Sequence, residues 1–207
     1  MPTYTPPAHA HQLYLNQLAR YLRDSRLIHA RWAIYAHEHC DPDTGRPDDE
    51  VAYARRQVQR DADLLSAFGA VFYHADTLVD VAQQQLDQLP DSEQTRHLAG
   101  QLRQLHTNTQ QLSAVHRRWI DRRDALPDGA GGKAHEALLA ESYSEARPHL
   151  DQWTDHGQAV LDVNAVAREQ LGPQTAPPAA TREDQLNAAP ATPPPAPRAA
   201  SPTGRIR

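Results

Sequence analysis

Apolar residues recur every seven positions along four separate segments of the chain. The clearest series lies within residues 48–88 and consists of Val51, Val58, Leu65, Phe72, Val79 and Leu86. Further apolar residues flank this series on both sides, so the face is wider than the narrow seam of a two-stranded coiled coil. The pattern predicts a long amphipathic helix that buries a broad face inside a helical bundle.

Similar patterns predict three more helices, at about residues 8–40, 92–126 and 133–171. The last of these contains Pro148, but its apolar spacing continues in phase across the proline, which indicates a kink and not an end. Clusters of proline, glycine and aspartate separate the four segments and are typical of helix breaks.

The connections between these helices span only about three to eight residues, and short connections favour antiparallel neighbours. The sequence therefore predicts an all-α fold, with four long helices packed up-down-up-down over residues 1–171. Residues 172–207 hold nine of the 17 prolines and two large aliphatic residues. We expect this proline- and alanine-rich tail to be disordered, because it has too little apolar surface to offset the entropy of ordering.

Composition narrows the setting in which the protein works. Cys40 is the single cysteine, which rules out an intramolecular disulfide and is typical of a reducing compartment. The N-terminus lacks a signal-peptide pattern, and no apolar run reaches the ~18 residues of a membrane span. We therefore expect a cytoplasmic protein without membrane contact. The net charge of −5 argues against general coating of nucleic acid.

Polar residues interrupt the predicted apolar faces at His29, Asp61, His116 and Tyr143. When each helical hairpin is folded about its loop, these four positions fall at the same height along the bundle axis. This predicts that they form one buried polar layer. One interpretation is a hydrogen-bonded network that fixes the register of the helices. The other is a metal or ligand site formed by His29, Asp61 and His116, although the Glu-x-x-His pairs of di-iron bundles are absent. We expect no cofactor.

Four arginines surround a tryptophan on the predicted third helix: Arg117, Arg118, Arg122 and Arg123. Such a cluster is a candidate for phosphate binding. Asp121 stands three and four residues after Arg118 and Arg117, so the same pattern also fits a solvated face with ion pairs inside the helix.

No catalytic constellation or phosphate-binding loop is apparent in the sequence, so we expect a protein that is not an enzyme. The leading hypothesis is an interaction or scaffold protein that binds another protein, or a second copy of itself, through a face of the bundle. Pro193–Pro197 in the tail favours polyproline II and would suit a polyproline-binding partner. The alternatives are a metal- or ligand-binding bundle that uses the polar layer and, third, an accessory nucleic-acid-binding protein that uses the arginine-rich face.

Overall fold

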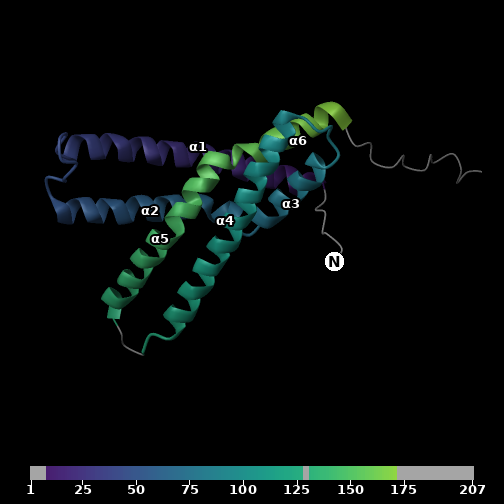
Figure 1. Ribbon diagram of the computed structural model, residues 1–207. Helices are drawn as coiled ribbons and strands as arrows, with labels where there is room; N and C mark the ends of the chain where they lie inside the picture. Colours follow the sequence, from purple (N-terminus) through teal and green to yellow (C-terminus); the bar gives the residue numbers. More distant parts are fainter. Residues whose placement is uncertain (1–7, 128–130, 172–207) are drawn as a thin grey trace, which may run out of the picture. The chain divides into compact units, whose positions relative to one another are not determined.

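The computed structural model describes residues 8–127 and 131–171, which form six helices (Figure 1). The prediction of an all-helical fold is confirmed for these residues, whose only β contact is an isolated bridge between Cys40 and Pro47. The helices are α1 (Ala8–His39), α2 (Glu50–Phe72), α3 (Ala75–Leu86), α4 (Glu93–Asp124), α5 (Gly131–His156) and α6 (Gln158–Leu171). The predicted tail, residues 172–207, lies outside the described residues.

The prediction of a single helix over residues 48–88 is wrong, because the chain bends by 60° between α2 and α3. At the bend, the His74 amide donates a hydrogen bond to the Val71 carbonyl across 2.9 Å. The His74 ring stacks on Tyr14 of α1, with ring centroids 3.8 Å apart. No single helix in the described ranges is long and apolar enough to cross a membrane, and only the bent α2–α3 pair would reach that length and composition.

The predicted helix 133–171 is also divided, at Gly157 between α5 and α6. Helix α5 runs through Pro148 without ending. A Cβ atom at Gly157 would lie 2.5 Å from the Trp153 carbonyl oxygen and 3.0 Å from Leu22 Cδ2 of α1. The tightest contact is with the backbone of α5, so the local backbone requires glycine where the helix breaks, and the Leu22 side chain of α1 adds a second close contact.

Two antiparallel hairpins, α1–α2 and α4–α5, organise the described residues, and Figure 1 shows their loop ends pointing in different directions. Helix α5 crosses the α1–α2 pair, and three buried aromatic rings meet at the crossing. The Phe68 ring centroid lies 4.9 Å from that of Tyr21 on α1 and 5.3 Å from that of Trp153 on α5. Buried leucines of α1, α2 and α5 belong to the same hydrophobic core as these rings: Leu18, Leu22, Leu64 and Leu150.

The apolar series of α2, which we call the α2 strip (Val51, Val58, Leu65 and Phe72), is not uniformly buried as the sequence predicts. Val51 is 71% exposed and Val58 is 38% exposed, whereas Leu65 and Phe72 are partly buried against the core. The fully buried residues of α2 lie beside the strip, at Leu64, Phe68 and Val71. The N-terminal half of the strip is thus left open where the two hairpins separate.

Candidate functional site

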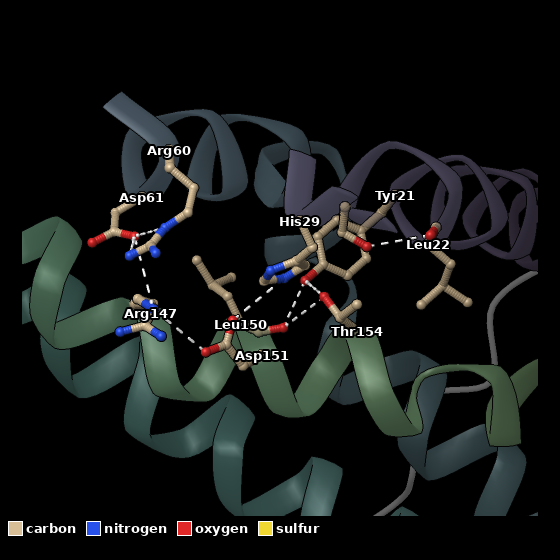
Figure 2. Close-up of polar contacts among 10 residues, drawn as sticks. Tyr21, Leu22, His29, Arg60, Asp61, Arg147, Leu150, Asp151 and Thr154 are labelled. Carbon is tan, nitrogen blue, oxygen red and sulfur yellow. Dashed lines mark hydrogen bonds and ion pairs between the residues drawn. The ribbon is translucent and has the colours of Figure 1, made fainter. Parts of the chain in front are cut away.

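Asp61 belongs to a chain of ionisable side chains that connects α2, α5 and α1 (Figure 2). Arg60 Nε donates a hydrogen bond to Asp61 Oδ1 across 2.7 Å. Arg147 Nε on α5 lies 3.9 Å from the same oxygen and 3.5 Å from Asp151 Oδ2. Asp151 Oδ1 in turn lies 3.4 Å from His29 Nε2 on α1. We call these five residues the ion-pair chain.

The pair at the inner end of the ion-pair chain is almost inaccessible to water. Asp61 is 4% exposed and Arg60 is 6% exposed. The guanidinium of Arg60 also lies over the ring of Trp32, 4.3 Å from its centroid, so the cation has a second favourable contact. Burial raises the pKa of Asp61, and the hydrogen bond from Arg60 opposes this rise.

A second polar contact holds α1 against α5 about two helical turns before His29. The Tyr21 hydroxyl donates a hydrogen bond to the Leu150 carbonyl across 2.8 Å and lies 3.1 Å from Thr154 Oγ1 (Figure 2). Burial raises the pKa of Tyr21, so its hydroxyl remains protonated across the physiological range. The ion-pair chain and this tyrosine together fix the position of α5 across the first hairpin.

The predicted polar layer is divided into two groups. His29 and Asp61 belong to the ion-pair chain, where Arg147 and Asp151 bridge them. His116 and Tyr143 instead line an apolar cavity between α2, α4 and α5. Among the described residues, no three His, Cys, Asp or Glu side chains are placed to share a metal ion. The structure therefore does not assemble His29, Asp61 and His116 into a metal site.

The cavity, which we call the three-helix cavity, has a volume of about 290 Å³. It is lined by three residues of α2 and the Tyr73 that follows it, and by four residues each of α4 and α5: Leu65, Gly69, Phe72 and Tyr73, then Leu112, Val115, His116 and Trp119, and then Leu139, Ser142, Tyr143 and Ala146. The His116 ring lies edge to face with Phe72, at a centroid distance of 5.2 Å. The His116 ring therefore forms part of the aromatic lining of this cavity.

Three arginines of the candidate phosphate face are engaged by acidic residues. Arg118 donates a hydrogen bond to Glu145 on α5 across 2.8 Å, and Arg122 donates one to Glu141 across 2.6 Å. Arg123 pairs with its neighbour Asp124 and covers the ring of Trp119. Arg117 is exposed. The pairs with α5 replace the pairs with Asp121 that the sequence suggested, and they compete with phosphate for the same guanidinium groups.

Sequence reasoning missed Arg60, Arg147 and Asp151 as members of the polar network. The spacing of Arg147 and Asp151, four residues apart on α5, was a usable signal, because such residues are neighbours on a helix surface. No comparable signal identified Arg60, because consecutive residues point in different directions on a helix.

Comparisons with protein-family models, with curated proteins and with solved structures found no match to this chain. The site must therefore be interpreted from its own geometry. In the described part of the chain, that geometry consists of a structural ion-pair chain, an apolar cavity without charged lining residues, and an open apolar strip on α2.

Proposed function

We propose that this protein is a non-enzymatic interaction protein that binds an amphipathic partner helix along the open half of the α2 strip. The observation that carries the proposal is the change in exposure along the strip, from 71% at Val51 and 38% at Val58 to partial burial at Leu65 and Phe72. An apolar strip with helical spacing is expected to be buried by another element.

The covered half of the α2 strip supports a helix as the occupant of the open half. At Leu65 and Phe72, the neighbouring surfaces belong to α4 and α5, including Leu139 and Tyr143. A partner helix at Val51 and Val58 would extend this helical packing along the same face of α2. It would also complete, around α2, the antiparallel bundle that the sequence predicts.

The other expectations from the sequence remain proposals of lower rank. The proline-rich segment Pro193–Pro197 would add a contact to a polyproline-binding partner, but it lies outside the described residues. Nucleic-acid binding is less well supported, since Arg118 and Arg122 are already paired with glutamates. A cytoplasmic location is retained from the presence of a single cysteine.

The proposal is tested by placing charges on the open half of the strip. The variant Val51→Glu with Val58→Glu buries two carboxylates in any helix–helix contact made there, so partner binding should fall at least tenfold. The matched control is Ala52→Glu with Gln59→Glu, which places the same charges on the next residues of the same helix. Binding is measured by co-purification with the full chain as bait, followed by titration of each recovered protein.

A recovered protein supports the proposal only if the control retains it and the strip variant loses it. Sedimentation equilibrium of the purified chain shows whether that partner is a second copy. Equal recovery with the strip variant and the control would contradict the proposal.

A further inference from the structure

The three-helix cavity has no charged group among its lining residues. Its walls are aliphatic and aromatic, and the lining side chains that carry polar groups are Ser142, Tyr73, Tyr143, His116 and Trp119. Apolar clefts that carry a few hydrogen-bonding groups are typical of small-molecule sites. A charge placed against these walls would lose water without gaining a charged partner, so the part of a ligand that fills the cavity should be uncharged.

Gly69 lies in the last turn of α2 and lines the three-helix cavity. A Cβ atom built on Gly69 has no other atom within 4 Å, and the backbone there does not adopt a positive φ. Neither close packing nor backbone geometry therefore requires glycine, although glycine inside a helix is unfavourable relative to alanine. A side chain at position 69 would extend into open space at the wall of the cavity.

The volume of the cavity limits the size of its occupant. An apolar cavity of about 150 Å³ accommodates benzene. A volume of about 290 Å³ is close to twice that size and matches a fused bicyclic ring with one small substituent. The hydroxyl and imidazole groups on α4 and α5 provide hydrogen-bond donors and acceptors for one polar atom on such a ligand.

We propose that the three-helix cavity is a binding site for an uncharged aromatic molecule of about two fused rings with a single hydrogen-bonding group, and that Gly69 keeps the cavity open. This site is separate from the open half of the α2 strip, because Val51 and Val58 do not line the cavity. Failure of one proposal therefore leaves the other standing.

The test uses 2-naphthol as the probe with the full chain. Calorimetric titration should show binding of one molecule per chain, and a saturating concentration should raise Tm by about 2 °C or more. Naphthalene-2-sulfonate has the same rings and a charge, and should bind at least tenfold more weakly because the cavity offers no partner for the charge. Equal binding of the two probes would overturn the proposal.

Variants at Gly69 assign the binding to this cavity. Gly69→Leu should fill the space and weaken 2-naphthol binding at least tenfold, while raising the Tm of the ligand-free protein. Gly69→Ala should weaken 2-naphthol binding to a smaller degree. If the leucine variant fails to fold, the alanine variant alone tests the role of Gly69. The matched control is Gly100→Ala on α4, where a Cβ atom meets only the Arg103 side chain at 3.9 Å. This control should leave 2-naphthol binding unchanged.

Unchanged 2-naphthol binding in Gly69→Ala and in any folded Gly69→Leu protein would place the probe elsewhere and overturn the proposal. Sedimentation equilibrium of the same variants provides a second check. If Gly69→Leu dissociates an oligomer of the wild-type chain, the cavity belongs to an interface between copies, and the small-molecule assignment is wrong.

Discussion

Arg60 and Asp61 are consecutive residues of α2, and they form a nearly buried ion pair in which Arg60 Nε donates to Asp61 Oδ1 across 2.7 Å. Consecutive side chains on a helix point about 100° apart and do not normally face each other. The long arginine side chain reaches back across that angle and also covers Trp32. The charge of Asp61 is therefore matched within α2, and Arg147 of α5 adds a longer contact.

Removal of one member of this pair should destabilise the protein strongly. We expect Arg60→Leu to lower the free energy of unfolding by about 3 kcal/mol or more, because it leaves the Asp61 carboxylate buried without its nearest partner. The double variant Arg60→Leu with Asp61→Leu should recover much of that loss. Urea unfolding of the single and double variants measures both effects, and additive losses would show that the two residues are not coupled.

His29 should contribute much less than Arg60, although the sequence suggested that histidine was the partner of Asp61. Its side chain is 34% exposed, and it contacts Asp151 instead of Asp61. His29→Ala is therefore expected to cost under about 1 kcal/mol. A loss of stability in His29→Ala as large as that in Arg60→Leu would show that His29, and not Arg60, is the principal partner of Asp61.

The raised pKa of Asp61 predicts a specific pH dependence of stability. Because burial raises the folded pKa above the ordinary value of 3.8, the folded protein binds the Asp61 proton more tightly than the unfolded chain does. Wild-type stability should therefore fall as pH rises from about 3.8 to the folded pKa, relative to Arg60→Leu with Asp61→Leu. Urea unfolding of both proteins across this range measures the difference. A relative gain of wild-type stability with rising pH would mean that the folded pKa is depressed.

The two phenylalanines of α2 should differ in their contribution to stability. Phe68 is fully buried between Tyr21 and Trp153, so Phe68→Ala should cost about 3 to 5 kcal/mol. Phe72 is partly exposed and borders an existing cavity, so Phe72→Ala should cost under about 2 kcal/mol. Thermal or urea unfolding compares the two variants. Equal losses of stability would mean that the buried face of α2 has been assigned wrongly.

Gly157 should be intolerant of a side chain, in contrast to Gly100. A Cβ atom at Gly157 would lie 2.5 Å from a backbone oxygen that cannot move without disturbing the end of α5. We expect Gly157→Ala to cost about 1 to 3 kcal/mol, whereas Gly100→Ala should be neutral or stabilising. The melting temperatures of the two variants measure this difference in tolerance. A stabilised Gly157→Ala protein would show that the Trp153 carbonyl oxygen does not approach position 157 so closely.

Local sequence patterns predicted which parts of the described chain are helical, because apolar spacing and helix breakers act over short distances, but they did not divide 48–88 or 133–171. The bend at His74 and the break at Gly157 were not predicted in the same way, and at both points the chain lies against α1, which is distant in sequence. Tyr14 stacks on His74, and Leu22 approaches Gly157. The apolar period continues through both breaks, so it does not mark them.

The candidate site was predicted only in part, for a related reason. Placing Asp61 in the interior required only its position on the face of α2, and the structure shows it buried. Its partners depend on how α5 crosses the first hairpin, and the assumption of parallel helix axes brought His116 level with Asp61. The observed crossing brings Arg147 to Asp61 instead and leaves His116 in the three-helix cavity.

The central claim is that the open half of the α2 strip contacts a partner helix, and site-specific photo-crosslinking tests it most directly. A photoreactive side chain is placed in turn at Val51, Val58, Ala52 and Gln59 of the full chain, and crosslinked adducts are resolved by mass. We predict adducts with one partner from positions 51 and 58 and little or none from positions 52 and 59, because only the first pair lies on the strip. Equal adducts from all four positions, or none from Val51 and Val58, would contradict the claim.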